Sequence, residues 1–224
     1  MKCAQLYLDK GCFLEALQNL TNEIAVYLYR EESFLLNYIK RGDFILDVGC
    51  GNGRASFYLA RKVGLEGKIF AIDNNKSMLE RASEEIKIFR NIELHQINAK
   101  KTPFNTSYFG VSVITFNTLG NLEEDERSII LNELHRITKP KGIIIGTVYS
   151  ENASDAQKEM YEGADLKVDK IDDDFVYVSE IEFKGERFTK DKLRKILLNI
   201  SPNIKIKKIC DIAYGFSVEV NKNV

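Results

Sequence analysis

Short apolar runs alternate with stretches of helical periodicity through the middle of the chain. The first run, Phe44–Val48, ends in glycines, as a buried parallel strand does. The pattern then predicts a helix at 54–63, a strand at 68–72, a helix at 77–89, strands at 92–97 and 111–116, a helix at 123–138 and a strand at 142–148. Strands that alternate with helices in this way are typical of a parallel sheet with helices on both faces.

The two flanks follow different patterns. Residues 13–39 carry apolar side chains at helical spacing, beginning with Leu14 and Leu17, and predict one or two helices. After the alternating region, the pattern predicts a helix at 153–163, one strand at 175–183, a helix capped by Thr189, and closing strands around 204–207 and at 213–220.

These elements predict an α/β fold. We expect a doubly wound, mostly parallel, seven-stranded sheet, preceded by a helical cap and interrupted after strand five by an α+β insertion. A chain of 224 residues with 44% hydrophobic content suits one domain with elaborations. Such sheets bind their ligands at the carboxyl ends of the strands, so the chemistry is sought there.

Composition narrows the classes of function. The net charge of −1 does not call for nucleic acid or an anionic membrane as a partner. The four cysteines form no C-x-x-C pair and no zinc spacing, so we expect no disulfide framework, no metal and a reduced, cytoplasmic compartment. No signal peptide or membrane span is evident. Local charge is uneven, because residues 150–174 are acidic and residues 182–208 are rich in Lys and Arg.

The loop after the first strand has the chemistry of a nucleotide-binding turn. Gly49, Gly51 and Gly53 let backbone N–H groups approach a ligand ahead of a helix N-terminus. A dinucleotide fingerprint needs a small residue where Arg54 stands, and Asp47 would repel a pyrophosphate. Asp47 would instead attract the ammonium group of a methionine moiety, so the charges favour S-adenosylmethionine.

Asp73 ends the second strand, where a carboxylate can accept hydrogen bonds from both ribose hydroxyls. The segments ILDVGCGNG and AIDNN resemble motif I and the following acidic motif of class I S-adenosylmethionine-dependent methyltransferases, and the resemblance extends over 44–149. It implies S-adenosylmethionine as cofactor and S-adenosylhomocysteine as product. Asn98 stands where the family usually has an acid beside the adenine, and an amide oxygen can also accept from the adenine amino group.

These arguments give two sets of candidate residues and no catalytic residue. The cofactor candidates are Asp47, Gly49, Cys50, Gly51, Asn52, Gly53, Asp73, Asn74, Met78, Asn98, Ala99, Asn117 and Leu119. The aromatic candidates for an acceptor pocket are Tyr27, Tyr29, Tyr149 and Tyr214.

The acceptor is expected to be a small molecule. The tip of the fourth strand, residues 116–121, lacks the patterns of base-amino and metal-dependent catechol methyltransferases, and its Leu-Gly-Asn piece is similar to a loop of some amine methyltransferases. The resemblance therefore suggests an amine as one acceptor class. Two alternatives stay open: an RNA or protein acceptor held by the Lys-rich C-terminal face, and a non-catalytic protein that binds S-adenosylmethionine.

The expected divisions of the chain follow from the fold. They are a helical cap at 1–42, a cofactor-binding core at 43–149, a lid that selects the acceptor at 150–189, and a closing helix and strands at 190–224. The oligomeric state is left open.

Overall fold

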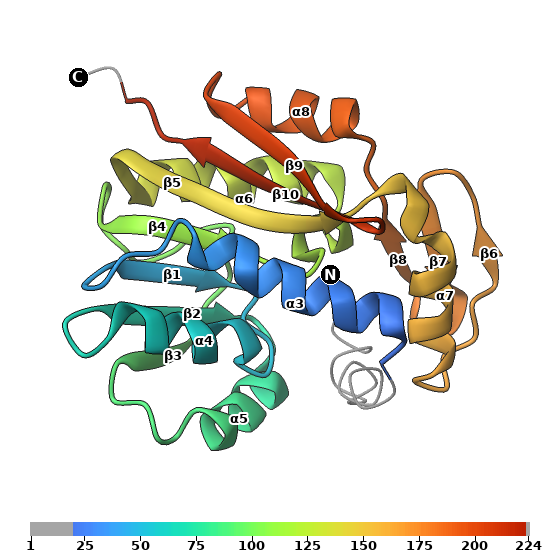
Figure 1. The fold of residues 1–224 in the computed structure, drawn as a ribbon, viewed down its shortest axis with the longest axis horizontal. Coiled ribbons are helices and arrows are strands. Elements are labelled where there is room, and N and C mark those ends of the chain that lie inside the picture. The colour runs from blue at the N-terminus through green and yellow to red at the C-terminus, as the bar shows by residue number, and fades with distance from the viewer. Residues whose placement is uncertain (1–19, 223–224) are drawn as a thin grey trace.

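The computed structural model describes residues 20–222, and its centre is a seven-stranded sheet in the order β3-β2-β1-β4-β5-β10-β9 (Figure 1). The strands are β1 (Phe44–Val48), β2 (Lys68–Asp73), β3 (Ile92–Gln96), β4 (Phe109–Ile114), β5 (Thr138–Tyr149), β9 (Ile204–Cys210) and β10 (Ala213–Glu219). Strands β1 to β5 pair in parallel, and β10 pairs antiparallel with both β5 and β9. The predicted mostly parallel sheet is confirmed.

Helices cover both faces of this sheet because its buried strands are apolar on both sides. The helices are α3 (Asn22–Leu36), α4 (Arg54–Val63), α5 (Lys76–Glu85), α6 (Glu124–Ile137), α7 (Ser154–Glu162) and α8 (Lys190–Leu198). Successive side chains of β1 point to opposite faces of the sheet. Ile45 packs in the core with α3 and α4, and Leu46 packs in the core with α6 and α8. The doubly wound arrangement is therefore confirmed (Figure 1).

The insertion after β5 differs from the predicted single strand at 175–183. It forms a hairpin of β7 (Phe175–Val178) and β8 (Phe183–Glu186), extended by β6 (Lys170–Ile171). Glu182, with φ 48°, turns the chain between the two strands. Alternation of side chains cannot distinguish one strand from two, and this turn has no Gly or Pro to mark it. Together with α7, the hairpin lies at one end of the main sheet (Figure 1).

Other predicted boundaries also shift, and one shift has a clear local cause. Strand β4 ends at Ile114 rather than at residue 116, because Phe116 and Asn117 have positive φ values of 46° and 60° and turn the chain out of the sheet. Within residues 20–42 the cap region forms one helix, α3, and the predicted helical positions Leu14 and Leu17 lie outside the described residues. Within residues 20–222, no helix has the length and apolar character needed to cross a membrane.

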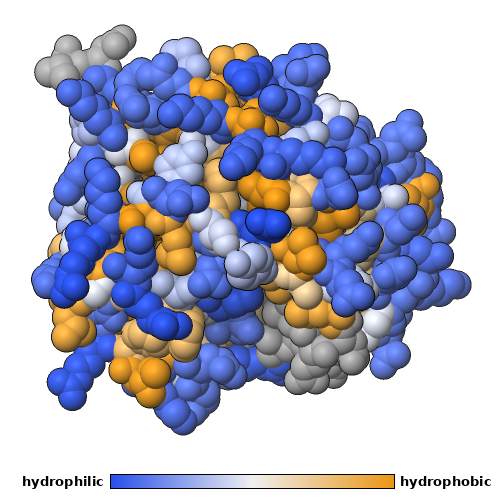
Figure 2. All heavy atoms as spheres, in the orientation of Figure 1, coloured by the Kyte–Doolittle hydropathy of each residue, from blue (hydrophilic) through white to orange (hydrophobic). Residues whose placement is uncertain are grey.

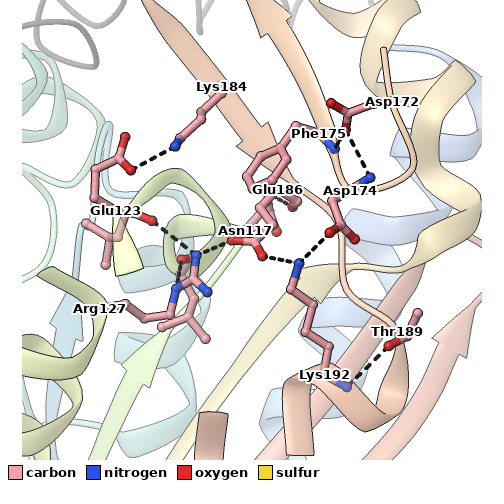
Figure 3. Close-up of polar contacts among 12 residues, drawn as sticks. Asn117, Glu123, Arg127, Asp172, Asp174, Phe175, Lys184, Glu186, Thr189 and Lys192 are labelled. Atoms are coloured by element: carbon pink, nitrogen blue, oxygen red, sulfur yellow. Dashed lines mark hydrogen bonds and ion pairs between the residues drawn. The ribbon is translucent and has the colours of Figure 1, made fainter. Parts of the chain in front are cut away.

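A buried ion pair fastens the insertion to the core (Figure 3). The Arg127 guanidinium of α6 donates to the Glu186 carboxylate of β8, and both side chains are 5% exposed. The Nε and Nη2 groups of Arg127 also donate to the carbonyls of Leu119 and Leu122. Lys192 of α8 pairs with the other oxygen of Glu186 at 2.6 Å. The carboxylate thus joins the insertion to two helices of the core.

Replacing Arg127 should weaken the fold strongly. We expect Arg127→Met to lower the free energy of unfolding by about 3 kcal/mol, since it leaves Glu186 buried with one partner fewer. Urea unfolding followed by circular dichroism measures this. Glu123→Gln is the matched control, because Glu123 pairs with Lys184 of β8 at the surface and should change stability by less than about 1 kcal/mol. Equal effects of the two variants would contradict a structural role for the buried pair.

Candidate functional site

The loop between β1 and α4 is shaped by its glycines. Gly49, Gly51 and Gly53 have φ values of 65°, 55° and 83°, a region that only glycine adopts readily. A Cβ atom on Gly49 would lie 2.8 Å from Cγ2 of Thr118. The missing side chains thus let the loop approach the tip of β4.

Asp73 holds this loop from the neighbouring strand. Its Oδ2 atom accepts from the backbone N–H of Gly51 and its Oδ1 atom accepts from that of Asn75, both at 2.9 Å. Burial raises the pKa of Asp73, and these backbone hydrogen bonds oppose the rise. The side chain still lines the cavity beside the loop, so its oxygens can accept from a ligand as well.

Asp47 lies behind the loop and is fully buried. Its Oδ2 atom accepts from the Ser56 hydroxyl at 2.6 Å, whereas Oδ1 has no hydrogen-bond partner among the described residues. Burial raises the pKa of Asp47 to about 6, against the opposing effects of the Ser56 hydrogen bond and the nearby Arg54. Asp47 is not part of the cavity wall, so direct contact with a ligand's ammonium group stays a prediction.

Two adjoining cavities lie at the carboxyl ends of the strands. The larger has a volume of about 170 Å³ and the smaller about 90 Å³. Both are lined by Gly49, Asp73, Thr118 and Leu122. Of the cofactor candidates, the larger cavity also has Cys50, Gly51, Asn52 and Met78 in its wall. The smaller one has Asn74, Asn98 and Ala99.

At the tip of β4, the residues that line the two cavities are not the two that the sequence predicted. Asn117 and Leu119 do not line either cavity, whereas Thr118 and Asn121 line the larger one. The reason is that residues 118–121 form a 3₁₀ turn, in which positions three apart share a face. Asn117 instead bonds backbone groups: it accepts from the N–H of Tyr149 and donates to the carbonyl of Glu186, each at 3.0 Å.

Among the cavities at this end of the sheet, one of the four tyrosine candidates is part of a wall. Tyr149 lines a small cavity of about 20 Å³ beyond the larger one. Tyr27 is fully buried and donates to Thr147, and Tyr214 donates to Glu151. Tyr29 is 67% exposed and lines none of these cavities, so its place in an acceptor pocket stays a prediction. Two positions apart on a helix face opposite ways, so the burial of Tyr27 turns Tyr29 toward solvent.

Several residues of the larger cavity were missed by the sequence analysis. Arg54, Phe116 and Thr118 belong to segments that the motifs had marked, so the segment was predictable and the side chain was not. Phe183 comes from β8 of the insertion, and no motif marked it. Figure 2, viewed from the side of α3, shows hydrophobic residues scattered over a mostly hydrophilic surface. Exposed apolar side chains are thus no guide to this site.

Comparison with known proteins agrees with this geometry. Residues 45–142 match a family described as a methyltransferase domain. A demethylmenaquinone methyltransferase from Lactobacillus johnsonii is 32% identical over 117 residues, covering 51% of this chain and 47% of that protein. A ubiquinone/menaquinone biosynthesis C-methyltransferase from Francisella tularensis subsp. novicida is 28% identical over 143 residues, covering 62% and 56%. The chain thus spans about half the length of these relatives.

The fold has a solved counterpart in a S-adenosylmethionine-dependent methyltransferase from Aquifex aeolicus. The TM-score is 0.61 at 22% identity, over 84% of this chain and 88% of that one. The fold, the glycine loop and the acids at the strand ends define a Rossmann-like protein. Residues 45–142 are therefore similar to the methyltransferase-domain family, on the fold of a solved S-adenosylmethionine-dependent methyltransferase.

The residues at the loop fit this cofactor. The space left by the glycines would be filled by a Cβ atom. Within residues 20–222 the buried Oδ1 of Asp47 has no hydrogen-bond partner, and its contact with an ammonium group stays a prediction. Among residues 20–222, no cluster of His, Cys, Asp and Glu is arranged to hold a metal ion.

Asp73 provides a direct test of the cofactor site. We expect Asp73→Asn to weaken S-adenosylmethionine binding at least about tenfold, because an amide offers one acceptor oxygen where the carboxylate offers two. Isothermal titration measures the affinity, and thermal melting checks that the variant is folded. Asp125→Asn, on the exposed side of α6, should bind as the wild type does. Unchanged affinity in folded Asp73→Asn would exclude a ribose contact.

The pKa of Asp47 leads us to expect that binding of S-adenosylmethionine depends on pH. With a pKa of about 6, the carboxyl loses its charge as the pH falls from 7 to 5, whereas the cofactor ammonium stays charged. Affinity for S-adenosylmethionine should therefore fall through pH 6, by up to about tenfold per pH unit. Asp47→Asn should bind more weakly at pH 7 and show a flat profile. Glu31, Arg54 and Asp73 also act on the Asp47 carboxyl. If the affinity of Asp47→Asn still falls with pH as it does in the wild type, a group other than Asp47 is the one that titrates.

Proposed function

We propose that the protein transfers the methyl group of S-adenosylmethionine to a small acceptor with a planar, apolar body. The observation that carries this proposal is the aromatic continuation of the cofactor cavity. Phe116 and Phe183 line the larger cavity and also the small cavity beyond it, which adds Asn117, Tyr149, Met160 and Tyr161. An acceptor that enters past the glycine loop would lie among these side chains.

The aromatic side chains are held in fixed mutual positions. The ring of Phe183 meets that of Tyr161 edge to face, with centroids 5.5 Å apart. The ring of Phe116 lies 6.0 Å from that of Tyr149 and 5.4 Å from that of Tyr27. Edge and face contacts of this kind suit a flat ring as the ligand. Because Phe116 belongs to the core and Phe183 to the insertion, the acceptor would lie between the two.

The scarcity of acidic side chains around the larger and the small cavity favours an uncharged acceptor. Within the described residues, Asp73 is the only acid of the larger cavity, and the small one has none. The acids of the insertion lie elsewhere: Asp172 accepts from the N–H groups of Asp174 and Phe175, and Asp174 pairs with Lys192 (Figure 3). An amine acceptor would therefore arrive neutral, and the assignment of an amine stays a prediction.

Methyl transfer mainly requires that the protein align the acceptor with the methyl group. The sulfonium already activates the methyl group, and transfer is an in-line displacement that needs the nucleophile within about 3 to 3.5 Å of it. An electron-rich ring carbon or a neutral amine can attack without a strong base. The two relatives named above are quinone-pathway enzymes by name, and one is called a C-methyltransferase. A hydroxylated aromatic ring is accordingly the acceptor class that we favour.

The part of the Lys-rich stretch that lies on β9 is far from this site. Lys205 and Lys207 are exposed on β9, at the edge of the sheet and four strand positions from β1. At about 4.8 Å per strand, the separation is about 19 Å. This distance supports a small acceptor over an RNA held by these lysines.

Labelled methyl transfer tests the proposal. The protein is incubated with S-adenosylmethionine carrying a ¹³C methyl group and a metabolite extract, and mass spectrometry identifies the labelled product. Phe183→Leu should then lower kcat/KM for that acceptor about three- to tenfold without changing cofactor affinity, since it removes one ring contact. Phe175→Leu is the matched control in the same hairpin, because Phe175 lines none of the three cavities and should leave kcat/KM unchanged.

Two outcomes would overturn the proposal. Label found only in RNA or protein, and lost at high salt or in the double variant Lys205→Gln/Lys207→Gln, would transfer the acceptor site to the C-terminal face. No labelled product from any extract, with cofactor binding intact, would leave a protein that binds S-adenosylmethionine without turnover.

A further inference from the structure

Three of the described residues line both the larger cavity and the small cavity beyond it. They are Phe116, Asn121 and Phe183, and together they form what we call the junction. Two of the three contribute aromatic rings, so among these residues Asn121 alone brings a polar side chain to the junction. An acceptor that extends from one cavity into the other would pass this amide.

The turn that carries Asn121 is held by the core. Asn121 ends the 3₁₀ turn at 118–121, and its backbone N–H donates to the carbonyl of Asn117 at 3.1 Å. The buried side chain of Arg127 donates from Nε to the carbonyl of Leu119, in the middle of the same turn, at 3.0 Å. The backbone from which the Asn121 amide extends is therefore fixed on both sides.

The other polar side chains of the small cavity are already engaged. The Asn117 amide bonds the backbone of β5 and of β8. The Tyr149 hydroxyl donates to the sulfur of Met160 at 3.5 Å. The Tyr161 hydroxyl lies against the backbone of β8, since a Cβ atom on Gly185 would be 2.7 Å from its oxygen. None of these three groups is turned freely toward a ligand.

The Asn121 amide differs from them. It is exposed, and within residues 20–222 its side chain makes no hydrogen bond or ion pair. An amide offers one acceptor oxygen and two N–H donors, so it can bond an uncharged polar group without bringing a charge into the cavity. Because water solvates the free amide, a ligand hydroxyl that replaces this water contributes the net strength of one ordinary hydrogen bond.

We propose that the Asn121 amide recognises a hydroxyl group on the aromatic ring of the acceptor. This inference rests on the proposed function, because it takes a flat ring as the ligand. The rings of Phe116 and Phe183 can contact the faces and edges of such a ring, but apolar contacts leave it free to rotate in its own plane. A hydroxyl that donates to Oδ1 of Asn121 removes this freedom. Asn121 is thus a specificity-determining residue that separates hydroxylated rings from rings whose oxygens are alkylated.

Two ring compounds that differ only in their oxygen substituents test this assignment. 1,4-Dihydroxynaphthalene has hydroxyl donors, and 1,4-dimethoxynaphthalene has the same ring with none. Each compound is titrated, in the absence of oxygen, into the full chain saturated with S-adenosylhomocysteine, and calorimetry measures its affinity. The wild type should bind the dihydroxy compound at least about threefold more tightly, as one hydrogen bond between neutral groups predicts.

Variants of Asn121 show whether its amide causes this preference. In Asn121→Leu, we expect affinity for the dihydroxy compound to fall about three- to tenfold and affinity for the dimethoxy compound to stay within about twofold. Asn121→Asp keeps an acceptor oxygen and should retain the preference. Asn152→Leu is the matched control, because this exposed asparagine of the 3₁₀ turn at 151–153 lines none of the three cavities and should leave both affinities unchanged.

The results separate this inference from the proposed function. A preference that survives in Asn121→Leu, or a wild type that binds both compounds equally, would overturn the inference and leave the aromatic acceptor site standing. Equal losses for both compounds in Asn121→Leu would mean that the residue only supports the cavity wall, and would overturn it also. A wild type that binds neither compound would contradict the aromatic acceptor class itself, and the inference with it. Thermal melting of each variant ensures that folded proteins are compared.

Discussion

The buried carboxylate of Glu31 is the interaction on which the site depends most. It lies on α3, outside the alternating core, yet its two oxygens bond a side chain of α4, a hydroxyl of β5 and a backbone N–H at the tip of β4. A buried charge is stable only when paired and hydrogen-bonded, so these partners and the carboxylate require each other. Helix α3 is therefore part of the site and not merely a cover for the sheet.

A second buried acid acts in the same way where the insertion meets the core. There, Glu186 of the insertion is the buried acid, and Arg127 and Lys192 are its cations. Each of these two networks brings a segment from outside the alternating core to a strand end of the sheet. Side chains from both attached regions line the larger cavity, Arg54 and Phe116 beside the first network and Phe183 from the strand that carries Glu186.

More of the fold than of the candidate site could be predicted from the sequence. Alternation and the glycine loop sufficed for β1, α4 and the doubly wound sheet, because these elements have strong and distinct periodicities. The hairpin of the insertion was missed because Glu182, a residue without turn preference, makes the bend. Local motifs found the correct segment at 116–121 but chose Asn117 and Leu119, since the 3₁₀ geometry that selects Thr118 and Asn121 has no sequence signature. Glu31 and Phe183 were out of reach, because their roles arise from contacts between segments distant in sequence.

The side chain of Asn117 has a consequence for how the molecule opens. Its amide takes the place of a peptide group, bonding the N–H of Tyr149 in β5 and the carbonyl of Glu186 in β8. Close by, a Cβ atom on Gly120 would lie 2.7 Å from that same carbonyl, so the two backbones are in contact. Separating the insertion from the core would break the turn that lines the cofactor cavity. Local unfolding of the insertion and opening of the cavity wall therefore belong to one cooperative event.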